Sequence, residues 1–179
     1  IDLCLTNGTM LRYRDPRRFG LWLYILENPL QHRLLNHLGP EPLSEECDGS
    51  YLHARAYNRT QCIKSFIMNN AIIVGVGNIY ATESLFLAGI HPKTPAGTLS
   101  EKQMHELIGH IKKVLQQAIN AGGTTLRDFY AVDGKPGYFS TALNVYGRQK
   151  LPCSVCNTLI QNITIAGRNS AFCPTCQRE

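Results

Sequence analysis

Apolar and polar residues alternate at the start of the chain, which predicts β-strands. The alternation covers residues 1–5, and the pair Asn7-Gly8 follows it. Asn-Gly is a preferred two-residue hairpin turn because both positions tolerate a positive φ. Residues 9–14 then return as a second strand, and the apolar run at 20–26 predicts a third, buried strand. Three strands make a poor sheet alone, so we expect further strands upstream.

Helical spacing replaces this alternation after residue 60. Thr60 is expected to cap a first helix. The stretch VGVGN at 74–78 breaks the pattern, and a second helix is expected over 79–88. Residues 27–59 are rich in Pro, Gly and Glu, with a short helix expected at 29–37, and they indicate a linker between two domains.

The longest predicted helix begins at Ser100. Ser100 and Gln103 have the spacing of a capping box, in which each side chain bonds to the backbone of the other residue. Gly122-Gly123 is expected to end the helix. Its expected buried face consists of Leu107, Ile111, Val114, Leu115, Ala118 and Ile119.

Composition indicates a folded protein with one or two small domains. The chain has 179 residues, of which 44% are hydrophobic, so global disorder is not expected. No apolar run is long enough to span a bilayer, and the first residues do not have the pattern of a signal peptide. The net charge of +5 is compatible with nucleic acid binding but does not require it.

The four cysteines near the C-terminus are the strongest chemical signal. They form two Cys-x-x-Cys pairs, and each such turn presents two thiolates to one ion, as in zinc ribbons. Free thiols are the alternative, and a purely structural zinc site is the simplest functional interpretation. The predicted ligands of one structural Zn²⁺ are Cys153, Cys156, Cys173 and Cys176. The other three of the seven cysteines are scattered, which fits a reducing cytosol better than a disulfide framework.

Three loop motifs have both a functional and a purely structural interpretation. VGVGN places Asn78 at a helix start, where it is either part of a phosphate clamp or part of a tight turn. DPRRFG contains Arg17 and Phe19, which either contact DNA or form a solvated turn with the ring in the core. DGKPGYF places Lys135 in a flexible loop of unassigned function. The histidines show no metal-binding spacing and are expected at the surface.

Taken in order, these motifs resemble those of bacterial formamidopyrimidine-DNA glycosylase, and the resemblance covers essentially the whole chain. The pair GGTTLRDF and DGKPGYF resembles this enzyme rather than the related endonuclease VIII. The motifs that carry the resemblance, besides the four cysteines, are DPRRFG, LGPEPL, VGVGNIYA, AGIHP, GGTTLRDF, DGKPGYF and VYGR.

The resemblance implies an α+β fold in four parts. Residues 1–40 would be the C-terminal part of a β-sandwich, and residues 41–59 would be the linker. Residues 60–150 would form a helix-two-turns-helix domain with a lesion-capping loop, and residues 151–179 a zinc-finger β-hairpin. The implied partner is double-stranded DNA containing oxidised purines such as 8-oxoguanine. The implied protein is a monomer of the bacterial cytoplasm with no membrane partner.

The resemblance also implies individual roles. Arg168 would contact phosphates beside the lesion and assist the last elimination step, and Asn78 and Lys64 would contact phosphates. Arg17 would fill the gap left by the flipped base, with Phe19 as a wedge beside it. Arg127 would begin the loop that closes over the flipped base, and Lys135 would lie at its other end and contact DNA. The implied activity is glycosylase and lyase chemistry in base-excision repair, by β,δ-elimination.

The chain departs from the family at its start. The family's nucleophile is an N-terminal proline followed by a glutamate, whereas this sequence begins at Ile1. A secondary amine is required for the covalent step. We therefore expect a fragment that lacks the opening part of the family's chain. The two hypotheses are an enzyme whose nucleophile lies outside these residues, and a zinc-containing DNA-binding fragment without catalytic activity.

Overall fold

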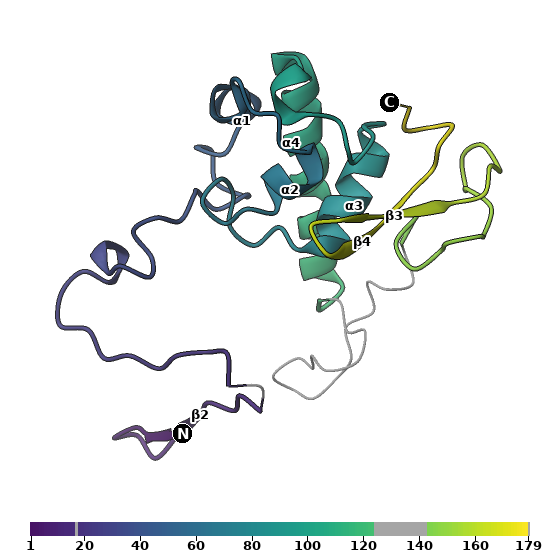
Figure 1. Cartoon of the computed structure of the whole chain (residues 1–179). Helices are drawn as coiled ribbons and strands as arrows, with labels where there is room; N and C mark the ends of the chain where they lie inside the picture. The colour runs from purple at the N-terminus through teal and green to yellow at the C-terminus, as the bar shows by residue number, and fades with distance from the viewer. Residues whose placement is uncertain (17, 124–142, 179) are drawn as a thin grey trace. The chain divides into compact units, whose positions relative to one another are not determined.

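The structure is a computed structural model that describes residues 1–16, 18–123 and 143–178 (Figure 1). The chain divides into two compact units, Ile1–Asn36 and His37–Glu179. No helix among the described residues has both the length and the apolar character needed to cross a membrane.

The first unit contains the predicted hairpin. Strand β1 (Asp2–Cys4) pairs antiparallel with β2 (Met10–Arg12), and Leu3 lies opposite Leu11. Gly8 has a φ of 81°, and the Asn7 Oδ1 atom accepts a hydrogen bond from the Thr9 amide at 3.0 Å. The predicted hairpin is therefore confirmed, but its turn is longer than a two-residue one: the Leu5 amide donates to the Thr9 carbonyl at 2.9 Å across residues 6–8, and of these only Gly8 has a positive φ.

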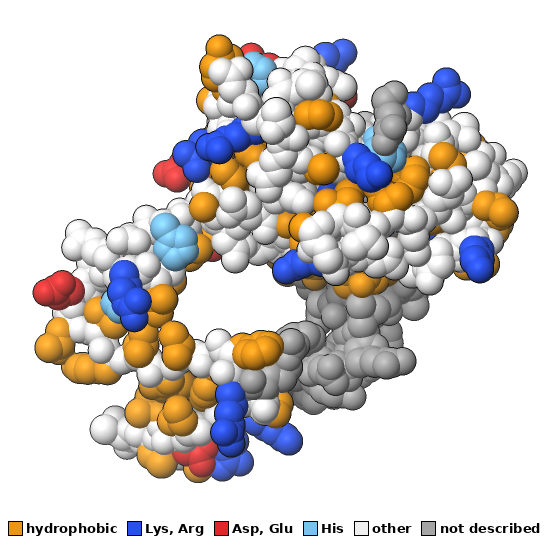
Figure 2. Space-filling model, in the orientation of Figure 1, with side chains coloured by type: hydrophobic (Ala, Val, Ile, Leu, Met, Phe, Trp, Pro, Cys, Tyr) orange, Lys and Arg blue, Asp and Glu red, His pale blue; other side chains and the backbone are white. Residues whose placement is uncertain are grey.

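The rest of the first unit differs from the prediction. Residues 20–26 form no strand, because no described segment pairs with their backbone. The expected short helix at 29–37 is a single 3₁₀ turn, η1 (Pro29–Gln31). Hydrophobic side chains lie on the surface of this unit (Figure 2). They include Leu3, Leu11, Phe19, Leu21, Leu23, Tyr24, Leu26 and Leu30.

The second unit is helical around one main core. Its elements are α1 (Gly49–Ala56), α2 (Ile63–Ile67), α3 (Asn78–Leu87), η2 (Ala96–Thr98) and α4 (Glu101–Asn120). The core includes Leu52, Phe66, Ile73, Leu85, Met104, Leu107 and Ile111, all fully or almost fully buried. Burial of this many large apolar side chains provides most of the stability of such a unit.

Helix α1 corrects the expected linker over residues 41–59. Asp48 caps the helix by accepting a hydrogen bond from the Tyr51 amide at 2.7 Å. Leu52 and Ala56 are buried, and α1 packs beside α4 (Figure 1). The composition of this segment resembles that of a loop, yet it forms a short helix because Leu52 and Ala56 face the core.

Helix α2 begins later than predicted. Its N-cap is Cys62, not Thr60. The Ile63 amide donates to the Thr94 carbonyl at 2.7 Å, and the Ala96 amide donates to the Gln61 carbonyl at 2.8 Å. This local pairing uses the backbone groups that a helix starting at Thr60 would need.

Helix α4 confirms most of its prediction. Ser100 and Gln103 form the capping box, and both Gly122 and Gly123 have positive φ. Five of the six residues predicted for the buried face of this helix are buried, whereas Ile119 is 59% exposed. Ile119 lies in the last turn of the helix, beyond the main core.

The chain ends in an antiparallel hairpin of β3 (Gln161–Ile165) and β4 (Arg168–Phe172). A small separate core joins it to α3 through Phe86, Val145, Ile160 and Ala171. Gln177 adds a polar connection: its Nε2 donates to the Ile90 carbonyl at 2.9 Å, and its Oε1 accepts from the Cys173 amide at 3.0 Å. The observed architecture agrees with the expected α+β class, with a helical domain and a C-terminal zinc-finger hairpin.

Candidate zinc centre and nucleic-acid interface

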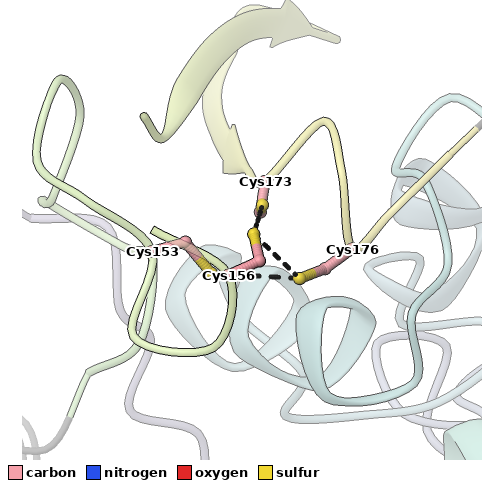
Figure 3. Close-up of side chains that lie close together, drawn as sticks. All are labelled: Cys153, Cys156, Cys173 and Cys176. Carbon is pink, nitrogen blue, oxygen red and sulfur yellow. Dashed lines mark hydrogen bonds between the residues drawn. The ribbon is translucent and has the colours of Figure 1, made fainter. Parts of the chain in front are cut away.

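The four predicted cysteines lie together. Cys153 and Cys156 belong to the turn before β3, and Cys173 and Cys176 to the turn after β4 (Figure 3). Their sulfur atoms all lie within 4.8 Å of one another. The Cys156 Sγ atom lies 3.4 Å from that of Cys173 and 3.5 Å from that of Cys176.

Four thiolates at this separation fit one tetrahedral Zn²⁺ ion. The ion would supply no catalytic chemistry here, because all four positions are taken by protein ligands. It would join the two turns at the base of the hairpin and so make the hairpin rigid. The predicted structural zinc site is therefore supported by the geometry of its donors.

The tip of the hairpin places Arg168 at the first position of β4. The turn consists of Ala166 and Gly167, with φ values of 47° and 72°, and Ile165 pairs with Arg168 across it. Two consecutive positive φ values are typical of the tight turn that matches the twist of a hairpin. The Arg168 side chain is exposed at this tip.

Lys64 of α2 holds the backbone beside Arg168. Its Nζ atom donates to the Asn169 carbonyl at 3.1 Å and to the Ser170 Oγ atom at 2.6 Å. Ser170 Oγ lies 3.4 Å from the Arg168 carbonyl oxygen, to which it donates. Lys64 is only 1% exposed and Ser170 is fully buried.

Asn78 reaches the same carbonyl group. It is the first residue of α3, after the N-cap Gly77, and its Nδ2 atom donates to the Asn169 carbonyl at 3.2 Å. The Asn78 Oδ1 atom is buried and has no partner among the described residues. The predicted residues Lys64, Asn78 and Arg168 therefore gather at the hairpin tip.

A pocket of about 230 Å³ lies between α2 and the hairpin tip. Both Lys64 and Arg168 line it, and no carboxylate among the described residues pairs with either. Burial, and then the nearby Arg168 charge, lower the pKa of Lys64 from 10.5 to about 8. Two cations without a described counterion favour the binding of an anion from solution. The remaining lining residues are Gln61, Ser65, Met68, Ile165 and Ala166.

The other predicted site residues lie in the first unit or outside the described residues. Phe19 lies in the first unit and is 80% exposed. Arg17, Arg127 and Lys135 lie outside the described residues. Their expected roles stay predictions.

Several residues of the second unit have structural roles that the sequence did not indicate. Glu83 is 2% exposed and accepts hydrogen bonds from the Asn144, Val145 and Tyr146 amides at 2.8 to 2.9 Å. His91 was expected at the surface, but it is 5% exposed, with its ring edge-to-face against Phe172. The Glu83 carboxylate fixes residues 144–146, which precede the first zinc turn. No local sequence motif predicts such a long-range contact.

Two protein families match the second unit. "Formamidopyrimidine-DNA glycosylase H2TH domain" matches residues 38–130, and "Zinc finger found in FPG and IleRS" matches residues 150–178. The second family covers all four cysteines. The first begins upstream of α1, in agreement with the placement of that helix in the helical core.

Similar proteins cover nearly all of the chain. A formamidopyrimidine-DNA glycosylase of Legionella pneumophila (strain Lens) is 62% identical over 177 residues, which are 99% of this chain and 65% of that protein. One of Aliivibrio fischeri (strain MJ11) is 55% identical over 99% of this chain and 64% of its own length. The chain thus spans just under two thirds of the curated relatives it matches.

Solved structures support the same relationship. The crystal structure of MutM (FPG) from Thermus thermophilus has a TM-score of 0.89 at 38% identity, covering 99% of this chain and 68% of that one. A complex between Lactococcus lactis Fpg and DNA containing an abasic site has a TM-score of 0.75 at 38% identity. That match covers 82% of this chain and 54% of that one.

Proposed function

The chain belongs to the formamidopyrimidine-DNA glycosylase family, and from this premise we propose that it binds the phosphate backbone of damaged duplex DNA in base-excision repair. The main support for this proposal is the pocket that Lys64 and Arg168 both line. It combines two cations with no described carboxylate partner, at an exposed hairpin tip that a metal site makes rigid. A phosphate group has the charge and the acceptor oxygens that such a pocket requires.

In this proposal Arg168 makes the direct phosphate contact. Its guanidinium is exposed and offers several donors in a planar fork, which suits a phosphate better than a single ammonium does. Asn78 lies at the N-terminus of the ten-residue helix α3, where backbone amides also favour an anion. Lys64 lines the same pocket, and its ammonium is hydrogen-bonded within the protein.

The zinc site would keep this arrangement fixed before DNA arrives. A short two-stranded hairpin is marginal by itself, and metal binding supplies folding free energy to such modules. A tip that is already ordered loses less conformational entropy on binding. This is the contribution we assign to Cys153, Cys156, Cys173 and Cys176.

We extend the proposal to the chemistry of the family. The substrates would be oxidised purines such as 8-oxoguanine and formamidopyrimidines, and strand cleavage by β,δ-elimination would follow base removal, with Arg168 assisting the last step. Arg17 would fill the gap left by the flipped base, with Phe19 as a wedge beside it. Arg127 and Lys135 would bound the loop that covers the flipped base. The protein would act as a monomer in the bacterial cytoplasm.

A second candidate is DNA binding without base removal. The groups gathered at the hairpin tip are a guanidinium, an ammonium and a carboxamide. These groups bind anions, and none of them is the secondary amine that attacks the sugar in this chemistry. For the 179-residue chain alone, this second candidate predicts binding without a covalent intermediate.

Two measurements test the proposals. Fluorescence anisotropy with a duplex containing 8-oxoguanine opposite cytosine, and with the undamaged duplex, measures binding; absence of saturable binding would refute the main proposal. Borohydride reduction in the presence of the damaged duplex measures covalent chemistry. A trapped complex supports the glycosylase and lyase activity in this chain, and binding without trapping supports the second candidate.

A further inference from the structure

The buried ammonium of Lys64 is directed at the hairpin backbone. It donates to the Asn169 carbonyl at 3.1 Å and to the Ser170 hydroxyl at 2.6 Å. The Ser170 hydroxyl in turn donates to the Arg168 carbonyl at 3.4 Å. The two peptide groups that follow the Arg168 side chain are therefore both connected to one lysine of α2.

From this geometry we infer that Lys64 is a positioning residue for Arg168: it fixes the backbone from which the exposed guanidinium reaches the DNA. The inference rests on the proposed DNA-binding function and deepens it by assigning Lys64 a role that acts through another residue. An ammonium has three donors, and two of them are already used within the protein.

Lys64 and Arg168 differ in burial, and this difference indicates different roles. Lys64 is 1% exposed, whereas Arg168 is exposed at the tip. A side chain with so little accessible surface has limited contact with a large polyanion. The same ammonium is well placed to restrict the conformation of Arg168, because its partners are the next two residues of β4.

Asn78 strengthens the restraint from a second helix. Its Nδ2 donates to the Asn169 carbonyl at 3.2 Å, so this one oxygen accepts from both α2 and α3. Two donors from different elements define the position of a peptide group better than one does. The zinc site restrains the base of the hairpin, and Lys64 restrains its tip.

A double-mutant cycle on DNA affinity provides the first test. The variants are Lys64→Met, Arg168→Met and the double variant, each with zinc content verified. Loss of a charged hydrogen bond to phosphate is expected to weaken binding by about tenfold in Arg168→Met. If Lys64 acts through Arg168, Lys64→Met weakens binding several-fold alone and changes it less than about twofold when Arg168 is already replaced.

A matched control and a milder variant accompany the cycle. Lys112 Nζ donates to the Ser44 carbonyl at 2.8 Å, so Lys112→Met removes a comparable lysine-to-backbone bond away from the hairpin. We expect this control to leave the hairpin tip unchanged. Ser170→Ala keeps the Lys64 charge and removes the hydroxyl relay, so it is expected to weaken binding in the same direction by a smaller factor.

Amide hydrogen exchange without DNA tests the positioning separately from DNA binding. Lys64→Met and Ser170→Ala are expected to speed exchange at residues 167–170 by at least about fivefold, while Lys112→Met does not. Unchanged exchange at the tip, or fully multiplicative affinity losses in the cycle, would overturn the inference. If no variant and no wild-type protein binds DNA, the proposed function fails, and the exchange data still decide whether Lys64 orders the tip.

Discussion

Lys64 and Asn78 donate hydrogen bonds to the same oxygen atom, the Asn169 carbonyl, at 3.1 and 3.2 Å. These residues lie on α2 and at the start of α3. Their common acceptor belongs to the hairpin tip, which is remote from both in the sequence. Two helices of the helical domain thus contact one peptide group of the zinc hairpin beside Arg168.

The metal site leads to the first prediction. We expect one zinc ion per chain, and we expect Cys173→Ser to lose it, because four thiolates are needed to close the tetrahedron. Elemental analysis of the purified protein measures the ratio. Cys4→Ser is the matched control, since Cys4 is exposed in the first unit, and it should retain full zinc content. Full retention in Cys173→Ser would contradict the assignment.

Removal of the metal should affect the hairpin more than the helical core. The main core contains no residue of the zinc turns or of the hairpin strands. A strong chelator is therefore expected to abolish protection of β3 and β4 in hydrogen exchange while most of the helical circular dichroism remains. Loss of the helical signal at the same chelator concentration would show that the core depends on the metal.

DNA affinity is expected to fall steeply with salt. Neutralisation of several phosphates releases counterions, which gives a log-log slope of roughly −3 to −5. Arg168→Ala should reduce the magnitude of this slope by about 1, because one phosphate contact is lost. Anisotropy titrations over a range of salt concentrations measure it. Arg178→Ala is the control: Arg178 follows the zinc turn and does not line the Lys64 pocket, so its slope should stay near that of the wild type.

Lys64 predicts a change of stability at alkaline pH. Burial and Arg168 lower its pKa from 10.5 to about 8, so between these values the folded chain has released a proton that the unfolded chain retains. Unfolding then takes up a proton, and stability rises with pH across this window; below about pH 8 the contribution is constant. Urea denaturation at several pH values measures it. The stability of the wild type relative to Lys64→Met should increase by on the order of 2 kcal/mol across the window.

The hairpin turn offers a stabilising substitution. Ala166 has a φ of 47°, a conformation that costs a side chain with a Cβ atom roughly 1 kcal/mol. Ala166→Asn gives the Asn-Gly pair that this turn prefers and should stabilise the hairpin by about 0.5–1 kcal/mol. Ala166→Val should destabilise it, because a branched side chain tolerates positive φ poorly. Thermal denaturation of the zinc-loaded proteins measures both, and equal stability of the two variants would contradict the assigned turn.

The hydrogen bonds of Glu83 predict that a conservative substitution at this position causes a large loss of stability. Its carboxylate accepts three backbone hydrogen bonds and one from the Asn144 side chain. Glu83→Gln removes the charge and turns an NH₂ group toward donors, at a cost of about 2–4 kcal/mol. Glu106→Gln on the exposed face of α4 is the control and should change stability by less than about 0.5 kcal/mol. Equal effects in urea denaturation would show that the Glu83 contacts contribute little.

Local sequence signals predicted the elements that depend on local interactions. The hairpin at the Asn7-Gly8 pair, the Ser100 capping box and the cysteine spacing all concern residues that are close in sequence or belong to a recurrent motif. The structure confirms each of them.

The predictions that the structure corrects concern interactions between residues distant in the sequence. Residues 20–26 are apolar enough for a strand, but a strand also requires a partner, and none of the described segments supplies one. The composition of residues 41–59 predicts a linker, whereas the stability of helix α1 within it comes from packing on α4. The placement of Lys64 depends on Asn169 and Ser170, which are remote from it in the sequence, so no local pattern reveals it.

The connections of the zinc hairpin also limit how it can be transplanted. Lys64, Glu83 and Gln177 each join the hairpin region to the helical domain through buried polar groups. A hairpin grafted onto another scaffold with its four cysteines alone would carry its metal but leave Ser170 and the Asn169 carbonyl without their donors. A transplant that keeps these donors therefore needs α2 and α3 together with the core on which they pack, with the arginine at the tip as the element to vary.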